Sequence, residues 1–495
     1  MRGRKTTRMG AIGISLLALA ASCARNPVTG WPELTLVSEA KERKLGKAEA
    51  RRVAQTMGIV EDPALAGYVR AVGEQLARVS PRQGVPYTFQ VVDMKEPNAF
   101  ALPGGPVYVS RGLLVLMNSE DEFAGVLAHE VGHVAARHAV QRVSRAAPLA
   151  VLTGVGAAVT GIVSPTLGDL VGGVGGFAGA FVLAPYSRGQ EHDADRIGQE
   201  LAAKAGWDPA GLSRSLRSLE REEALHRGEQ RATSFFATHP KLPDRVGETE
   251  KRAATLARAS AAPVAVGRDA FLRRLDGLPV GARPRDGLFD GQTFVHPDLD
   301  FRLRLPDGWK TANERTIVGA SAPDRRGVVA LELVGDSDDP AAALRAFEEK
   351  AHIDLATHAE RLSVGGLPAV HAATTARTRD GEIALDLTWV AHAGRIYRIT
   401  GATRPDALPA MAPLFRATVE SFRPLTEREL AAVRETRLRL VTARAGETLG
   451  DVLARARSTW NPETAAVANG LEATGRLAAA QLVKVAVAEP YARGR

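Results

Sequence analysis

The sequence predicts an α+β protein whose first half is mostly helical, and three observations support this. Helical periodicity runs through 38–56, 62–79 and 120–143, whereas the short runs 87–92 and 106–110 indicate strands. A Gly- and Pro-rich stretch, GLPVGARPRDG, then marks a boundary, after which strand-like alternation dominates. A chain of 495 residues is also too long for one ordinary core, so several domains are expected.

The N-terminus has the pattern of an export signal. A basic stretch and a short apolar run precede small residues and Cys23. The stretch LALAASC is similar to a bacterial lipobox, although Ala20 stands where Leu is usual, and Ala24 favours the outer membrane over inner-membrane retention. We therefore expect residues 1–22 to be a signal peptide and the product to be an exported periplasmic lipoprotein, anchored to the outer membrane through lipidated Cys23. A soluble secreted product and an uncleaved anchor are the alternatives.

Charge and cysteine content argue against a nucleic-acid partner and exclude sites that need several cysteines. The net charge of +8 includes four basic residues at the extreme N-terminus, and no long basic block follows, so nucleic acid is not an expected partner. Cys23 is the single cysteine, which excludes an intramolecular disulfide and a Cys-rich zinc site.

The segment 148–185 is apolar, rich in Gly and Ala, and contains one charged residue, Asp169. Two interpretations stay open: helices packed over or beside the functional site, or helices that cross a membrane. Several glycines and Pro165 interrupt the apolar run, which favours packed helices.

Residues 288–425 are expected to form a separate accessory α+β domain. Apolar residues alternate with Arg over 301–305, Asp339 and Pro340 open a helix, and IALDLTWVAHAGRIYRITG indicates a hairpin that turns near Gly394. We find no catalytic constellation in this domain.

The last unit, 430–490, has the pattern strand, helix, helix, strand. Its first helix starts after Thr448 and its second ends at Asn469 and Gly470. With the pieces AGETL and NGL, this βααβ order resembles a LysM module, a small fold associated with cell-wall glycans. The usual Gly before the closing strand is missing, so peptidoglycan binding and a purely structural cap both stay open.

The stretch AGVLAHEVGHVAARH indicates a metal site. Residues four apart share one face of a helix, so His129 and His133 can converge on one ion, while Glu130 can meet a water molecule there. His138 lies on the opposite side of a continuous helix and is excluded as a ligand. The pattern of a metzincin is also absent, because it requires Gly at 136 and His at 139, where this chain has Ala.

A catalytic zinc site needs a third protein ligand and an open position. In YSRGQEHDADRIG, Glu191 and Asp195 are again four apart on a predicted helix. One carboxylate as a ligand and the other orienting a ligand imidazole would complete a site with two His and one Glu.

Four motifs in order identify a resemblance. NAFALPGGPVYVSRGLL, DEFAGVLAHEVGHVAARH, YSRGQEHDADRIG and THPKLPDR resemble the HtpX-like and type I CAAX prenyl protease-like zinc metallopeptidases, peptidase family M48, in particular their exported bacterial lipoproteins. The resemblance covers roughly 26–255. It implies a gluzincin-type fold, mostly helical with a small sheet, in which Glu191 is the third zinc ligand and Asp195 supports a ligand from outside.

The same resemblance implies where substrate binds. It places the residues of NAFALPGG on the approach to an edge strand that pairs with the substrate backbone, which here means Asn98, Ala99 and Phe100. It also puts His239 and Arg245 near the zinc cleft, where His239 faces the metal or the oxyanion. Either of these two residues is expected to assist the oxyanion as a catalytic residue. A loop contact beside Pro240 is the alternative for His239.

The expected function is that of a zinc-dependent endopeptidase with one Zn²⁺ per chain, in which Glu130 acts as general acid and base. Its expected substrates are unfolded or misfolded envelope proteins. The rivals are a catalytically silent envelope scaffold or chaperone-like lipoprotein, and an integral membrane protease. The expected organisation is a signal peptide (1–22), a metalloprotease domain (23–257), a linker (258–287), an accessory domain (288–425) and a LysM-like module (430–490).

Overall fold

The structure is a computed structural model that describes residues 23–25, 28, 32–34, 37–142, 185–228, 231, 233–241, 243–260, 262–378 and 381–493. The apolar segment 148–185 lies outside these residues except at its end, so its two interpretations stay predictions. None of the described helices combines the length and the apolar character needed to cross a membrane.

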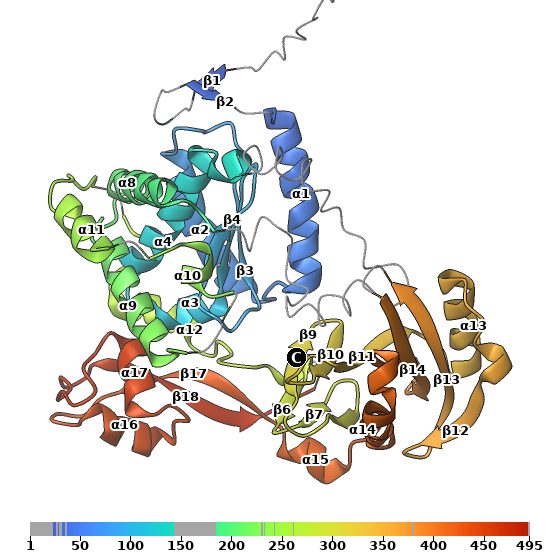
Figure 1. Ribbon diagram of the computed structural model, residues 1–495. Helices are drawn as coiled ribbons and strands as arrows, with labels where there is room; N and C mark the ends of the chain where they lie inside the picture. Colours follow the sequence, from blue (N-terminus) through green and yellow to red (C-terminus); the bar gives the residue numbers. More distant parts are fainter. Residues whose placement is uncertain are drawn as a thin grey trace, which may run out of the picture.

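The first half is a helical body around a small sheet (Figure 1). The sheet has the strand order β3-β5-β4, with β3 parallel to β5 and β4 antiparallel to it, so β4 lies at an edge. The predicted helices 38–56 and 62–79 and both predicted strands are confirmed. The elements are β1 (Cys23–Arg25), β2 (Pro32–Leu34), α1 (Glu39–Thr56), α2 (Pro63–Arg78), β3 (Thr88–Val92), β4 (Ala99–Ala101), β5 (Pro106–Ser110), α3 (Arg111–Leu116), α4 (Glu120–Ala135), α8 (Arg188–Lys204), α9 (Gly211–Leu225), α10 (Phe235–Thr238), α11 (Arg245–Ala253) and α12 (Arg268–Leu275).

Helix α4 lies in the centre of this body. Ser119 caps it by accepting a hydrogen bond from the backbone N–H of Glu122, and acidic residues fill its first turn, where the helix dipole favours them. Its side chains are almost all buried. The predicted continuous helix over 120–143 is wrong at its end, because α4 stops at Ala135 and Arg137 adopts a left-handed conformation with φ of 56°.

Close contact between α4 and α8 depends on small residues. A Cβ atom on Gly198 would lie 2.8 Å from the Cα atom of His129, and one on Gly132 would lie 3.1 Å from the carbonyl oxygen of Ala194. The missing side chains therefore let the two backbones approach closely. This approach brings the first turn of α8 beside the two histidines of α4.

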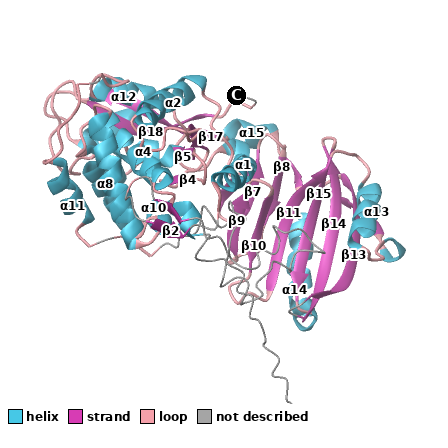
Figure 2. Cartoon of the chain, turned by 90° about the horizontal axis from the view of Figure 1, so that it is seen from above, coloured by secondary structure: helices cyan, strands magenta, loops and turns pink. Residues whose placement is uncertain are grey.

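The second half contains a large antiparallel sheet, which lies beside the helical body (Figure 2). Its strand order is β12-β13-β14-β15-β11-β10-β9, and the predicted hairpin is the β14–β15 pair. A smaller sheet has the order β16-β8-β7-β6. These elements are β6 (Leu288–Asp290), β7 (Thr293–His296), β8 (Phe301–Arg304), β9 (Lys310–Glu314), β10 (Ile317–Ser321), β11 (Gly327–Gly335), α13 (Pro340–Ala351), β12 (Glu360–Val364), β13 (Leu367–Thr378), β14 (Gly381–His392), β15 (Arg395–Thr403), α14 (Leu408–Glu420), β16 (Arg423–Pro424) and α15 (Glu427–Ala432).

The C-terminal residues have the predicted βααβ order, formed by β17 (Arg434–Thr442), α16 (Leu449–Ala456), α17 (Pro462–Asn469) and β18 (Leu482–Pro490). They pack on the helical body, where α17 lies against α9 (Figure 1). The fully buried Lys484 donates hydrogen bonds from Nζ to the carbonyl oxygens of Val115 and Met117, at 2.7 and 2.8 Å. The resemblance to a LysM module stays a prediction.

The segment 258–287, which was expected to be a linker, contains the helix α12 and packs on the helical body. Phe271, Leu272 and Leu275 are fully buried in the same apolar core as the helical body. Beyond the helix, Val280 donates a backbone hydrogen bond to the carbonyl of Thr436 in β17. Much of this segment is therefore a packed part of the fold.

Candidate metal centre

Three elements bring together four side chains that could hold a metal ion. Helix α4 contributes His129 and His133, the first turn of α8 contributes Glu191, and His239 follows α10 directly. One potential ligand atom from each lies within 4.8 Å of all the others, and all four residues are buried. The three predicted ligands are thus close together, and His239 joins them.

The distances between the ligand atoms suit a single ion. Nε2 of His129 lies 3.0 Å from Nε2 of His133 and 3.3 Å from Nδ1 of His239. Oε1 of Glu191 lies 3.3 Å from Nε2 of His133 and 3.1 Å from Nδ1 of His239. Tetrahedral ligands about 2.0–2.1 Å from a zinc-sized ion lie roughly 3.3–3.4 Å apart. Imidazole and carboxylate donors at these separations therefore fit a tetrahedral metal ion.

Asp195 and Arg245 support the cluster from outside. Oδ1 of Asp195 lies 2.9 Å from Nδ1 of His129, the ring nitrogen that faces away from the other ligands. Arg245 donates two hydrogen bonds of 2.7 Å to the Asp195 carboxylate, and its Nη1 lies 3.0 Å from Oε2 of Glu191. The Arg245 guanidinium thus holds the carboxylates of Glu191 and Asp195.

Glu130 is fully buried, and neither of its carboxylate oxygens has a hydrogen-bond partner among the described residues. Its nearest charged neighbour is Nε2 of His239, 3.4 Å from Oε1. Burial raises the pKa of Glu130, while His239 and His129 oppose this shift. A buried carboxylate without a hydrogen bond is costly, so these oxygens are suited to accept one from a polar group that enters the site.

Electrostatics favour the protonation states that bind metal. Burial lowers the pKa of His133 well below its usual value, which keeps the imidazole neutral. Burial alone would raise the pKa of Glu191, but His239, His133 and His129 hold it well below its usual range. Burial alone would also raise the pKa of Asp195, but Arg245 and His129 keep it below its usual value.

His239 closes the cluster on the side of the sheet. Its ring stacks on Phe235 with centroids 4.4 Å apart, and its backbone N–H donates to the Phe235 carbonyl. Its Nε2 lies 3.3 Å from the carbonyl oxygen of Ala99 in the edge strand β4. Burial would lower the pKa of His239, but Glu191 and Glu130 raise it.

The predicted substrate-binding residues have different surroundings. The Asn98 side chain is buried and donates a hydrogen bond to the Thr233 carbonyl, while Phe100 stacks on Tyr108 in the core. Ala99 presents its backbone carbonyl to His239. Contacts with a substrate here would use the backbone of β4. Cys23, the predicted lipidation residue, begins β1 and is not part of the cluster.

Sequence reasoning did not predict that His138 and Tyr186 contact the ring of His133. His138 places Nδ1 2.8 Å from Nδ1 of His133, and Tyr186 stacks on the His133 ring with centroids 3.7 Å apart. The exclusion of His138 assumed a continuous helix, which the break at Arg137 removes. Tyr186 gave no sequence signal beyond its place before Ser187, the cap of α8.

Comparisons with known proteins show which proteins this chain is similar to. The model of peptidase family M48 matches residues 63–253. The Beta-barrel assembly-enhancing protease of Yersinia pestis is 30% identical over 219 residues, which cover 43% of this chain and 44% of the relative. Its namesake from Escherichia coli K12 is 28% identical, covering 49% and 50%. Metalloprotease YcaL of the same strain is 30% identical over 192 residues, covering 37% of this chain and 70% of the relative. The chain spans about half the length of the first two relatives.

Proposed function

Because the chain belongs to peptidase family M48, we propose that it is a zinc-dependent endopeptidase of the cell envelope. The observation that carries the proposal is the convergence of four ligand atoms beside the buried carboxylate of Glu130, which accepts no hydrogen bond from the described residues. His129, His133 and Glu191 would hold the zinc. The identity of the metal is part of the proposal, supported by the mixture of imidazole and carboxylate donors.

Glu130 is the proposed general base and acid. When bound, zinc supplies Lewis acidity, which makes a water molecule a nucleophile near neutral pH. Glu130 accepts the proton of the attacking water and then donates it to the nitrogen of the leaving amine as the peptide bond breaks. Its buried position supports this role, because a raised pKa favours uptake of the proton.

Asp195 and Arg245 are proposed as positioning residues. Oδ1 of Asp195 lies 2.9 Å from Nδ1 of His129, and this contact favours the tautomer that carries its proton on Nδ1 and leaves Nε2 able to bind metal. Arg245 was predicted to assist the oxyanion, but its contacts with Asp195 and Glu191 support a role in holding the carboxylates instead.

The proposed substrates are unfolded or misfolded envelope proteins, and names of relatives such as Beta-barrel assembly-enhancing protease support an envelope location. An extended substrate segment can pair with the exposed backbone of an edge strand, whereas a folded protein offers no such segment. The edge strand β4 lies beside the cluster, with the Ala99 carbonyl facing His239.

This substrate preference has a direct test. The full chain with zinc is expected to cleave casein, which lacks a stable fold, and to leave a tightly folded protein of similar size intact until that protein is denatured. Equal cleavage of the folded and denatured forms would contradict the preference. Absence of cleavage with zinc bound would favour the rival function, a silent scaffold.

His239 is proposed to act as a gate. Its Nδ1 lies in the cluster and its Nε2 faces the edge-strand carbonyl, so with a metal bound His239 would be a fourth ligand and would also cover the pairing edge. His239 must therefore leave before a substrate carbonyl can enter.

We expect His239→Ala to increase basal casein cleavage and to leave three metal ligands in place. The measurement is the initial rate at saturating zinc, with bound zinc determined on the same sample. A fall of about 10²-fold would instead identify His239 as a donor to the oxyanion. Unchanged cleavage and unchanged metal affinity would leave it a loop histidine.

Anchoring through Cys23 is also a proposal. Lipidation of Cys23 would hold the mature chain on a membrane, because several acyl chains together bind firmly. We expect Cys23→Ser to move the protein from the membrane fraction to the soluble fraction of the envelope. Retention in the membrane would refute this anchor, provided that the mass of the mature N-terminus rules out an uncleaved signal.

A further inference from the structure

The two histidines of α4 have different partners on their outer nitrogens. His129 faces the carboxylate of Asp195, whereas His133 faces another imidazole, that of His138. We propose that His138 is a positioning residue of the metal centre, which accepts the Nδ1–H of His133 and so keeps Nε2 of that ring unprotonated for the metal. This inference rests on the proposed metal site.

The geometry restricts the hydrogen positions. The two Nδ1 atoms of His133 and His138 are 2.8 Å apart, so one must donate and the other must accept. Nε2 of His133 lies 3.0 Å from Nε2 of His129 and 3.3 Å from Oε1 of Glu191, so it is the nitrogen that would bind the metal ion. A ligand nitrogen carries no proton, hence His133 is protonated on Nδ1 and His138 accepts there.

The orientation of the His133 ring is fixed from two sides. Tyr186 stacks on its face with an angle of 19° between the planes, and His138 meets its edge at 72°. Stacking restrains the plane of the ring but allows either tautomer. The contact with His138 selects the tautomer and the rotation that point Nε2 at the cluster.

The chain reaches this arrangement through the left-handed turn at Arg137, which directs His138 back toward α4. Nε of Arg137 donates to Oε2 of Glu42, and Nη2 donates to the Val37 carbonyl, both at 2.9 Å. A left-handed conformation is unfavourable for Arg, so contacts of this kind are needed to hold it.

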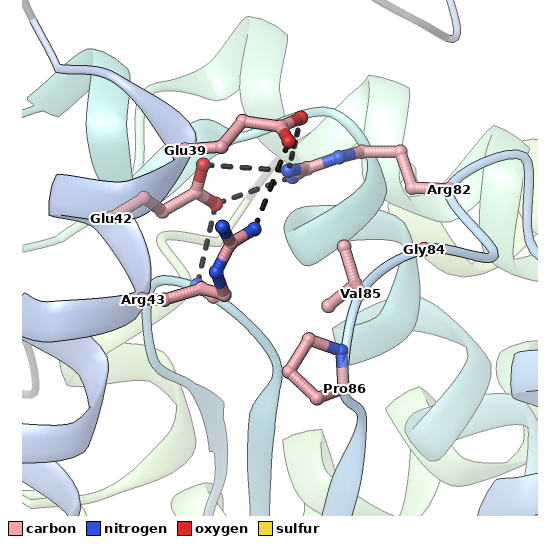
Figure 3. Close-up of a pocket in the computed structure, with 8 residues that line it drawn as sticks. Glu39, Glu42, Arg43, Arg82, Gly84, Val85 and Pro86 are labelled. Carbon is pink, nitrogen blue, oxygen red and sulfur yellow. Dashed lines mark hydrogen bonds and ion pairs between the residues drawn. The ribbon is translucent and has the colours of Figure 1, made fainter.

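Glu42 also ties the end of α4 to the rest of the body. Figure 3 shows Glu42 of α1 joined to Arg82. Both residues line a cavity of about 120 Å³. Arg82 donates to Oε1 of Glu42 at 3.2 Å and to the carbonyl of Val134, in the last turn of α4, at 2.9 Å. Glu42 is fully buried, so its two arginine partners form a fixed support for the turn before His138.

The test compares zinc affinity in full-length variants by competition with a chelator. We expect His138→Leu, which has no acceptor, to weaken zinc binding about 10- to 100-fold, the usual effect of losing such a support. His138→Gln keeps an acceptor oxygen and is expected to retain affinity within about threefold of the wild type. The control is His226→Leu, which replaces a partly exposed histidine that pairs with Glu222. This variant should bind zinc like the wild type.

Two results would overturn the inference: wild-type affinity in His138→Leu, or a loss in His138→Gln as large as that in His138→Leu. Should His138→Leu fail to fold, Glu42→Gln replaces it and is expected to lower zinc affinity several-fold. An unchanged zinc affinity in Glu42→Gln would refute the proposal that Glu42 supports the turn before His138. A wild-type chain that binds no zinc would instead contradict the proposed function, so the two failures are distinguishable.

Discussion

Glu130→Gln is expected to reduce casein cleavage by about 10²- to 10⁴-fold while zinc remains bound, because Glu130 contributes proton transfer and no metal bond. Glutamine has nearly the same shape and cannot accept the proton of the attacking water. Since both oxygens of Glu130 lack hydrogen-bond partners among the described residues, the substitution removes no hydrogen bond between them and changes only the 3.4 Å contact with Nε2 of His239. The readouts are the cleavage rate, the zinc content and the melting temperature.

A matched control for this variant is Asp193→Asn, which also neutralises one carboxylate near the centre but on the exposed side of α8. We expect it to cleave casein at the wild-type rate. Full activity in Glu130→Gln would refute the mechanism, and loss of zinc in this variant would mean that Glu130 is itself a ligand.

The second large effect is expected for Glu191→Ala. This variant should lose zinc affinity by more than about 100-fold, since even the partners of ligands are worth 10- to 100-fold. The change removes the only carboxylate of the cluster and leaves Nη1 of Arg245 without its contact with Glu191. Chelator competition measures the affinity, and cleavage should fall with it at limiting zinc.

Glu200→Ala provides the control on the same helix, since Glu200 pairs with Arg196 at the surface of α8. It should bind zinc like the wild type. Native zinc affinity in Glu191→Ala would show that the third ligand lies elsewhere, and His239 would be the next residue to test.

Sequence alone was sufficient where the signal is local. Helical spacing predicted α1 and α2, and the intervals His129–His133 and Glu191–Asp195 predicted which side chains share a face. The hairpin of β14 and β15 followed from alternation around Gly394. Each of these features is decided within a few residues of chain.

Long-range contacts decided the features that were missed. The end of α4 depends on Arg137, whose left-handed turn is held by Glu42 from a distant helix. The sequence around Lys484 does not predict that this residue is fully buried, because the carbonyls that accept its hydrogen bonds lie at the end of α3, far away in the sequence. For His239, the sequence predicted a place near the cleft but not the orientation of the ring. Its contacts with Glu191 and Ala99 define that orientation.

The central claim is that one zinc ion at this cluster supports peptide cleavage that depends on Glu130. The most direct measurement determines zinc content and casein cleavage on the same preparations of the wild-type chain and Glu130→Gln. We predict one zinc per chain in both proteins and cleavage in the wild type alone. Cleavage without zinc, or equal cleavage by both proteins, would contradict the account.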